Sequence, residues 1–348
     1  MATIYDIAKL ANVSAMTVSR VINNSGRISP RTREKVKRIM EELNYVPNST
    51  ARSLVKQETK MLSLLITDIT NPFFTTLARG AEDAAMELGY KLLFGNSDEK
   101  LSKEREYVDI VLSTRVDGLL LAPASDASAE HLAMLNVHRI PFVLVDRDVP
   151  GMEADVVLGE NRSGADRLTD YLISLGHRRI ALVNGFGTVS TARERYAGYR
   201  DALDRHHLPY DESLVVEYGY NRFYDPDKLE QVLRLPDPPT AIFAANNVLA
   251  VSMIAFLRDK GIGVPEQMSV VCFEDVGLAS KLDPFLTVAM QPAYDFGYKG
   301  VRLLAERIRL KDELGRQVVR LPSEMIVRKS AAAPPLAESV RPDPLPFE

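Results

Sequence analysis

A short stretch near the N-terminus, Ser14 to Asn23, carries side chains that suit the exposed edges of DNA bases. Arg20 can form a bidentate pair with a guanine, whereas Ala15 and Met16 offer only apolar contact, which suits thymine methyl groups. The same residue types also occur on the surface of an ordinary helical bundle. The stretch by itself therefore leaves both interpretations open.

A second set of polar side chains lies in loops that follow short apolar runs later in the chain. Ligands of parallel α/β sheets bind outside the carboxyl ends of the strands, and two facing sheets would join those ends in one cleft. Polar groups beside Phe73 and Phe74 would suit a sugar or another small polar metabolite. The loops contain residues 68–74, Asp146, Arg147, Glu160, residues 191–195, Tyr220, Asn246, Asn247, Glu274 and Asp275.

Three capped helical patterns would position the first group. Thr3 and Asp6 form a loose capping box, Ser14 caps a second helix, and Ser29 followed by Pro30 starts a third. Apolar spacing extends these helices to about residues 11, 22 and 43. Two helices joined by a short turn form the geometry that lets the second helix enter the major groove of DNA. The outward side of that helix would carry Ala15, Met16, Ser19 and Arg20, flanked by Ser14, Thr17 and Asn23.

After Lys60 the chain alternates apolar runs with helical patterns, which is typical of a parallel sheet covered on both faces. We expect two similar doubly wound α/β lobes, with the chain crossing between them near Asn161, residues 245–247 and residues 290–292. The expected strands cover residues 62–66, 91–94, 118–121, 142–145 and 156–158, then 180–183, 214–216, 241–244, 269–273 and 287–290.

Charge is divided unevenly along the 348 residues. Residues 1–60 carry a formal net charge of +6 and residues 61–348 carry −10, so a basic segment is attached to an acidic body. This division favours a polyanion as the partner of the first segment. The single cysteine, Cys272, allows no intrachain disulfide, and neither a signal peptide nor a membrane-spanning run is recognised. A cytoplasmic protein without a membrane partner is expected.

The motifs of the first 56 residues resemble the DNA-binding head of the lactose-repressor (LacI/GalR) family. The resemblance implies a homodimer that reads pseudopalindromic, double-stranded operator DNA, with Ala15 and Met16 at variable base-reading positions and Arg20 at a constant one. It also implies a hinge helix that folds only on the operator and inserts Leu54 into the minor groove. The matching motifs are Ile4 to Ala8, Val13 to Asn23, Thr32-Arg33, Tyr45 to Asn48 and Ala51 to Leu54. The predicted DNA contacts are Tyr5, Ser14, Ala15, Met16, Thr17, Ser19, Arg20, Asn23, Asn48, Ala51, Arg52 and Leu54.

The later chain resembles the same family's effector-binding core, which is similar to periplasmic sugar-binding proteins. The resemblance rests on residues 67–74, 115–118, 176–180, 195–199, 239–242 and 327–330, and it implies effector contacts at Arg195 and Asp275. The chain has Asn247 where the family usually has aspartate, and an amide donates as well as accepts hydrogen bonds. If Arg147 and Arg195 both face the cleft, they would favour an anionic effector such as a sugar acid or sugar phosphate. The predicted ligand contacts are Phe73, Phe74, Asp146, Arg147, Glu160, Thr191, Arg195, Tyr220, Asn247 and Asp275.

These observations predict a ligand-responsive transcriptional repressor, dimeric or tetrameric, without a cofactor or a metal. No Walker loop, HExxH, CxxC or GxSxG motif suggests an enzyme. A solute-binding protein is the main alternative, and an architectural DNA protein is another; the head opposes the first and the cleft opposes the second. The predicted parts are a helix-turn-helix head (1–46), a hinge helix and linker (47–60), a two-lobed effector-binding and dimerisation core (61–330) and a flexible tail (331–348).

Overall fold

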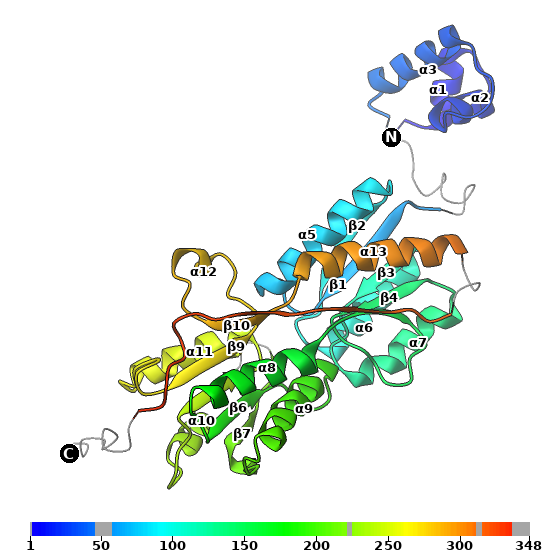
Figure 1. Ribbon diagram of the computed structural model, residues 1–348. Coiled ribbons are helices and arrows are strands. Elements are labelled where there is room, and N and C mark those ends of the chain that lie inside the picture. The colour runs from blue at the N-terminus through cyan, green and yellow to red at the C-terminus, as the bar shows by residue number, and fades with distance from the viewer. Residues whose placement is uncertain (1, 46–57, 221–224, 311–314, 336–348) are drawn as a thin grey trace. The chain divides into compact units, whose positions relative to one another are not determined.

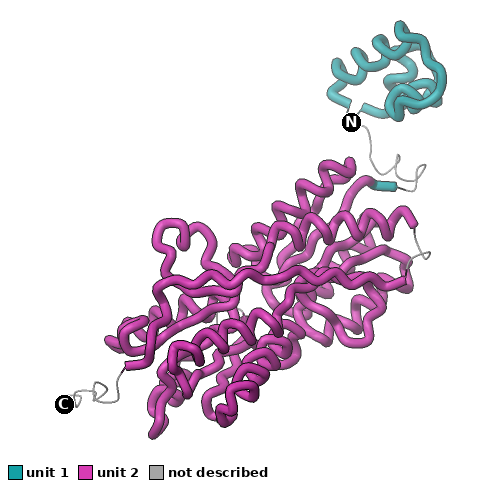
Figure 2. The backbone as a smooth tube through the Cα atoms, viewed as in Figure 1, with its two compact units in different colours: residues 1–59 teal, residues 60–348 magenta. Residues whose placement is uncertain are grey.

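The computed structural model describes residues 2–45, 58–220, 225–310 and 315–335 of the chain. The chain divides into two compact units, Met1–Thr59 and Lys60–Glu348, which Figure 2 shows in separate colours. The predicted hinge helix lies outside the described residues. Each unit contains its own buried apolar residues, so each is described by itself.

The first unit contains the three predicted helices. Thr3 and Asp6 form the expected capping box, and the Oγ atoms of Ser14 and Ser29 accept hydrogen bonds from the third residue after each. Asn12 ends the first helix with a left-handed backbone (φ 53°), and this turn leads directly into the second helix. The helices are α1 (Ile4–Ala11), α2 (Ala15–Ile22) and α3 (Pro30–Glu42). Their shared core consists of Ile7, Ala8, Ala11, Val18, Val21, Val36 and Ile39.

The second unit contains two six-stranded sheets with helices on both faces (Figure 1). The first sheet has the order β11-β5-β4-β3-β1-β2 and the second has the order β12-β10-β9-β8-β6-β7. All neighbouring strands are parallel except the pair of β10 and β12. The two orders match position by position, so β6, β8 and β9 occupy in the second lobe the places that β1, β3 and β4 occupy in the first. The prediction of two doubly wound lobes is confirmed.

The first lobe is built from strands β1 (Met61–Ile66), β2 (Lys91–Asn96), β3 (Gly118–Leu121), β4 (Phe142–Val145), β5 (Asp155–Gly159) and β11 (Val318–Leu321), with helices α5 (Pro72–Glu87), α6 (Leu101–Thr114), α7 (Ala129–Val137) and α13 (Ala293–Leu310). The second lobe is built from strands β6 (Ile180–Asn184), β7 (Val215–Glu217), β8 (Ala241–Ala244), β9 (Ser269–Phe273), β10 (Thr287–Met290) and β12 (Glu324–Ile326), with helices α8 (Asn161–Ser174), α9 (Ser190–Arg205), α10 (Pro226–Leu233), α11 (Asn247–Asp259) and α12 (Ala279–Leu282).

The chain crosses between the lobes after β5, after β10 and after β11. The first two crossings are those predicted near Asn161 and residues 290–292. The crossing predicted at residues 245–247 is wrong, because α11 packs on strands of its own lobe through Leu249 and Met253. The third crossing instead joins β11 to β12, two short edge strands that were not predicted. Apolar and polar residues alternate only weakly in these two strands, and both Val318 and Glu324 are exposed.

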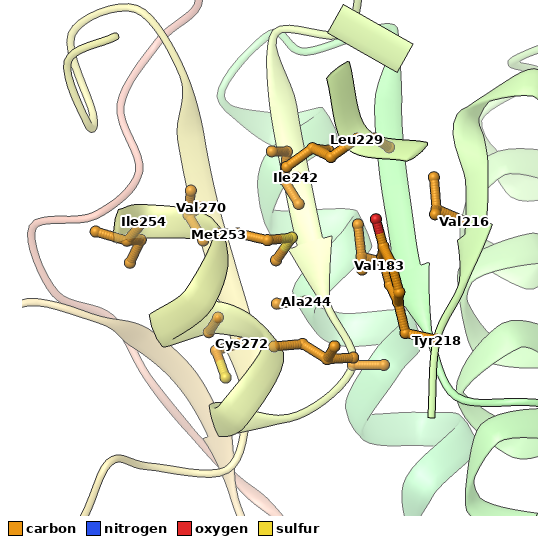
Figure 3. Packing of buried hydrophobic residues seen from close by; sticks show 14 of the residues in the cluster. Val183, Val216, Tyr218, Leu229, Ile242, Ala244, Met253, Ile254, Val270 and Cys272 are labelled. Carbon is orange, nitrogen blue, oxygen red and sulfur yellow. The ribbon is translucent and has the colours of Figure 1, made fainter. Parts of the chain in front are cut away.

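Apolar side chains fill the space between each sheet and its helices. In the second lobe, Val183, Ile242, Ala244 and Val270 of the sheet meet Met253 of α11, as Figure 3 shows. Each of these five side chains is fully buried. Burial of this kind stabilises a fold by about 1.5–3 kcal/mol for each large apolar side chain. The two cores therefore hold the strand ends of each lobe in fixed positions.

The helices α5 and α13 pack against each other in the first lobe, although α13 follows a strand of the second. A Cβ atom on Gly80 would lie 2.0 Å from the carbonyl oxygen of Tyr294, and one on Gly297 would lie 1.9 Å from that of Leu77. Two glycines therefore let the backbones approach each other closely. This contact fixes the chain that returns from the second lobe onto the first sheet.

The last described residues are held by the second lobe beyond the predicted start of the tail at Ala331. The backbone N–H of Ala332 donates to Ser269 Oγ at 3.0 Å, and its carbonyl oxygen lies 2.9 Å from Nε2 of His177. His177 thus fixes a chain segment. Residues 336–348 lie outside the described part of the chain.

Within the described residues, no helix is both long and apolar enough to cross a lipid bilayer.

Candidate functional site

The outer side of α2 presents the residues that the sequence assigned to base reading. Met16 is 63% exposed and Arg20 is also exposed, whereas Ala15 and Ser19 are half-buried. A Cβ atom on Gly26 would lie 3.3 Å from Cδ of Arg20. The loop after α2 therefore packs against the aliphatic part of the Arg20 side chain. This contact helps to orient the guanidinium group.

The remaining predicted DNA contacts surround this surface or lie outside the described residues. Tyr5 on α1 is 73% exposed. Asn23 donates to Ser19 Oγ at 3.3 Å, and its own Oδ1 is buried without a hydrogen-bond partner. At the start of α2, the hydroxyl oxygens of Ser14 and Thr17 lie 2.9 Å apart. The predictions for Asn48, Ala51, Arg52 and Leu54 fall on residues that the structure does not describe.

The carboxyl ends of the two sheets enclose a cavity of about 30 Å³. This volume corresponds to roughly one water molecule, whereas pockets for small ligands usually measure about 300–1,000 Å³. The cavity in this arrangement is therefore too small for a metabolite, which needs the lining side chains or the lobes to move apart. Among the described residues, the lining consists of Asp68, Asn71, Phe73, Phe74, Glu99, Asp146, Arg147, Thr191, Arg195, Tyr220, Asn246, Asn247, Glu274 and Gln291.

Two buried acids occupy equivalent places in the two lobes. Asp146 follows β4 and Glu274 follows β9, and both have left-handed backbones, with φ of 68° and 74°. Burial raises the pKa of Asp146 above its ordinary value, although the charges of Arg147 and Arg195 act in the opposite direction. Burial also raises the pKa of Glu274 to about 8, against the hydrogen bond from Gln291. Glu274 therefore carries a proton at neutral pH and can act as a hydrogen-bond donor.

Arg147 is engaged by a carboxylate of its own lobe. Its two terminal nitrogens donate to the two carboxylate oxygens of Glu99 at 2.8 and 2.7 Å. One of them also lies 3.0 Å from the carbonyl oxygen of Pro123. Both charged side chains are largely buried, with 4% and 11% of their surfaces exposed. Such bidentate, charge-assisted pairs are among the strongest hydrogen-bonded contacts in proteins.

Arg195 is held by neutral groups of the second lobe. Its Nε donates to Oδ1 of Asn161 at 2.9 Å, and a terminal nitrogen donates to the carbonyl oxygen of Ala245 at 2.5 Å. The guanidinium carbon lies 4.0 Å from the centre of the Phe273 ring. Ring and carbonyl contacts fix the orientation of the guanidinium group without neutralising its charge. Arg195 is therefore the less compensated of the two cavity arginines.

Aromatic rings close the cavity on both lobes. Phe73 and Phe74 at the start of α5 contact each other edge-to-face, with ring centres 5.1 Å apart. Tyr220 faces them from the second lobe and donates to Oδ1 of Asn184 at 3.2 Å. Apolar rings combined with a few fixed polar groups are typical of pockets for small molecules.

Two side-chain pairs beside the cavity are among the contacts that join the lobes. The side-chain amides of Asn71 and Asn247 bond to each other in both directions, at 3.1 and 3.0 Å. Asp126 of the first lobe forms a bidentate ion pair with Arg193 of the second, at 2.6 and 3.1 Å. We name these contacts the amide clasp and the charged clasp. Separation of the lobes must break both.

Comparison with known proteins identifies both parts of the chain. Residues 3–48 match the model for bacterial regulatory proteins of the lacI family, and residues 169–331 match the periplasmic binding protein-like domain. The HTH-type transcriptional regulator DegA of Bacillus subtilis is 37% identical over 334 residues, which cover 95% of this chain and 98% of DegA.

The chain belongs to the lacI family of bacterial transcriptional regulators.

Other lacI-family proteins agree with this assignment. The HTH-type transcriptional repressor PurR of Vibrio atlanticus is 34% identical, over 95% of this chain and 98% of its own. A structure described as a transcriptional regulator CelR-cellobiose complex shares 31% identity with a TM-score of 0.71, covering 95% of this chain and all of that one. The Lac repressor dimer bound to operator and the anti-inducer ONPF shares 26% identity with a TM-score of 0.80, covering 95% and 99%.

Within this lacI-family cleft, eight of the predicted ligand contacts line the cavity: Phe73, Phe74, Asp146, Arg147, Thr191, Arg195, Tyr220 and Asn247. The other two lie elsewhere. The Asp275 carboxylate forms an ion pair with Arg328, at 2.7 Å, and the preceding residue, Glu274, takes its place in the lining. Glu160 lies in a separate surface hollow beside Arg162 and Arg320.

The predicted ligand contacts omit Glu99 and Gln291, and they name Asp275 where the structure places Glu274 in the lining. Glu99 follows β2, so the rule that placed the other loops at strand ends could have included it. Gln291 lies at a predicted crossing, and it donates to Glu274 Oε1 at 2.7 Å. The choice between Glu274 and Asp275 depends on backbone dihedral angles, which the residue types do not reveal.

The raised pKa of Glu274 predicts a pH-dependent stability. In the folded protein Glu274 keeps a proton that the same residue loses above about pH 4.5 in the unfolded chain. The contribution of Glu274 to the free energy of unfolding therefore falls as the pH rises from about 4.5 to about 8. The slope reaches about 1.4 kcal/mol per pH unit within that window. Glu274→Gln cannot ionise, so its free energy of unfolding should fall less steeply between pH 5 and 8, measured by urea denaturation.

The exposed Glu153 provides a matched control, because Glu153→Gln makes the same substitution at the surface. The control should follow the parent curve. Parallel curves for the parent and Glu274→Gln across this pH range would contradict the assignment of a buried, protonated Glu274.

Proposed function

We propose that the protein is a repressor that binds a pseudopalindromic operator as a homodimer and releases or tightens its grip when a small neutral sugar enters the interlobe cleft. The observation that best supports this function is the combination in one chain of a basic helix-turn-helix unit with a cavity lined from two lobes. A solute-binding protein would require only the second part. The relatives named above are transcriptional regulators, which also argues against an enzyme.

The outer side of α2 contacts the DNA bases in this proposal. Arg20, whose stem rests on Gly26, suits the paired acceptors of a guanine, and the exposed Met16 suits a thymine methyl group. Lys9 and Arg31 are exposed on the same small unit and suit phosphate contacts, which position the helix without reading sequence. A further role is proposed for Leu54 as a wedge in the minor groove.

A homodimer would place two such heads on two half-sites. Apolar side chains on the body support self-association: Leu93 and Phe94 on the edge strand β2 are each 43% exposed, and Leu278 and Leu282 near α12 are 79% and 92% exposed. Exposed apolar groups of this kind mark contact surfaces. The Lac repressor to which this chain is similar is described as a dimer on its operator.

A neutral sugar fits the cleft better than the anionic effector predicted from the sequence. That prediction relied on two free arginines, whereas Arg147 is paired with Glu99. Among the described lining residues, the carboxyl groups of Asp68, Glu99 and Asp146 outnumber the two guanidinium groups even though Glu274 keeps its proton. An additional anion would meet a net repulsive field. One similar regulator is described in complex with cellobiose.

Control of DNA binding requires that the ligand change the spacing of the two lobes. The closed cleft has no room for a sugar, so ligand binding opens the lobes and breaks the amide clasp and the charged clasp. The linker, residues 47–60, would transmit this change to the heads. A coupling free energy of about 1–3 kcal/mol is sufficient for a useful switch and acts in both directions.

Base reading by α2 can be tested by selecting bound DNA from a random pool. Ala15→Gln combined with Met16→Ala should change the preferred sequence, because the base-facing groups differ. Affinity for random-sequence DNA should stay within about threefold, because phosphate contacts are unchanged. Met134→Ala, at an exposed methionine of the body, is the control and should leave the preference intact. An identical preferred sequence in the double variant would reject α2 as the reader.

The proposed dimer can be tested by analytical ultracentrifugation at micromolar concentration. Phe94→Asp should convert dimers to monomers, since it buries a charge in the apolar contact. Val318 on β11 is 49% exposed at the opposite edge of the same sheet, so Val318→Asp is a matched control that should remain dimeric. Dimers of unchanged stability in Phe94→Asp would place the interface elsewhere.

A further inference from the structure

The ion pair of Glu99 and Arg147 limits what Arg147 can offer to a ligand. Both terminal nitrogens of Arg147 already donate, to Glu99 and to backbone carbonyl oxygens. Its Nε is buried without a hydrogen-bond partner and lies 3.5 Å from Oδ2 of Asp146. Glu99 therefore occupies the end-on fork of the guanidinium group and offsets its charge, which leaves the Nε–H and one N–H of a terminal nitrogen uncommitted.

A second buried atom among the lining residues also lacks a hydrogen-bond partner, and this atom is an acceptor. Oε1 of Gln291 is buried without a hydrogen-bond partner, while the amide nitrogen of the same side chain donates to Glu274. This oxygen packs against Gly159, where an added Cβ atom would lie only 1.6 Å from it, so it is not presented to a ligand. The unused polar group of the described lining residues is therefore the Nε–H donor of Arg147. A ligand hydroxyl can satisfy that donor, since it accepts as well as donates.

The position of Glu99 is imposed by the backbone. Asp98 and Glu99 both have left-handed conformations, with φ of 57° and 58°, in the turn after β2. The N–H of Glu99 donates to the carbonyl oxygen of Thr67 at 3.1 Å. Two consecutive non-glycine residues rarely adopt this conformation. The turn therefore places Glu99 where its carboxylate reaches Arg147.

We propose that Glu99 is a specificity-determining residue that makes the cleft select uncharged polyhydroxy ligands and reject their acidic counterparts. It does so by engaging the guanidinium group that would otherwise bind an anion. The raised pKa of Glu274 agrees with this role, because a protonated carboxyl donates to a neutral hydroxyl. The inference rests on the cleft being a ligand site, as proposed above, and does not depend on DNA binding.

The substitution that tests the role is Glu99→Gln, which keeps the size of the side chain and removes its charge. Isothermal titration calorimetry on the full-length protein would compare neutral sugars with their acids: D-glucose with D-gluconate, D-galactose with D-galacturonate, and cellobiose with cellobionate. The variant should bind the acids at least about tenfold more tightly than the parent does, because Arg147 regains an unpaired charge.

Two controls separate this effect from a general loss of negative charge. Asp68→Asn removes another carboxylate of the lining, one that accepts hydrogen bonds from Thr70 and not from Arg147. The increase in affinity for the acids should therefore be several-fold smaller in Asp68→Asn than in Glu99→Gln. The double variant Glu99→Gln with Arg147→Met should lose the gain altogether. Thermal unfolding would verify that each variant is folded.

The proposal is overturned if folded Glu99→Gln gains no affinity for any of the acids, or if the parent already prefers an acid to its neutral sugar. It is also overturned if the double variant keeps the gain. If the protein behaves as predicted in these titrations but binds no specific DNA sequence, the selectivity of the cleft is supported and the proposed regulatory function is refuted.

Discussion

Burial of charge where the two sheets meet is the constraint on which the rest of the body depends. An unpaired charge inside a protein is strongly unfavourable, yet Asp146, Arg147, Arg195 and Glu274 are all less than a tenth exposed. The four are compensated in different ways: Arg147 by Glu99, Asp146 by the neighbouring Arg147, Arg195 by carbonyl and ring contacts, and Glu274 by retaining a proton. These solutions require strand ends held in fixed positions, so the apolar cores of both lobes are a condition for the chemistry of the cleft.

The two clasps are counterparts under exchange of the lobes. Asn71 follows β1 and bonds to Asn247 after β8, whereas Asp126 follows β3 and pairs with Arg193 after β6. One clasp is neutral and the other is charged and partly exposed, so added salt weakens only the second. Hydrogen bonds contribute about 0.5–1.5 kcal/mol each and exposed ion pairs up to about 1 kcal/mol. The sum for these two contacts is comparable with the coupling of about 1–3 kcal/mol that allosteric proteins use.

Local signals in the sequence predicted the helices and most strands because caps and apolar runs act over a few residues. Ser14, Ser29 and the run at residues 269–273 behave as their types suggest. Features set by distant contacts were not predictable in this way: the third crossing at β11 and β12 depends on partners across two sheets, and the exchange of Asp275 for Glu274 depends on one left-handed residue. The ion pair that argues against an anionic effector was not predictable for the same reason, since Glu99 is 48 residues from Arg147. The expectations of a dimer, an operator and a hinge helix came from the resemblance to lactose-repressor proteins and not from local patterns.

The central claim is that ligand in the cleft and operator on the heads influence each other. The most direct measurement determines operator affinity with and without saturating sugar, by fluorescence anisotropy, and sugar affinity with and without operator, by calorimetry. The account predicts the same factor in both directions, on the order of 5- to 150-fold, because the coupling free energy is reciprocal. A sugar that binds in the cleft while operator affinity stays unchanged would contradict it.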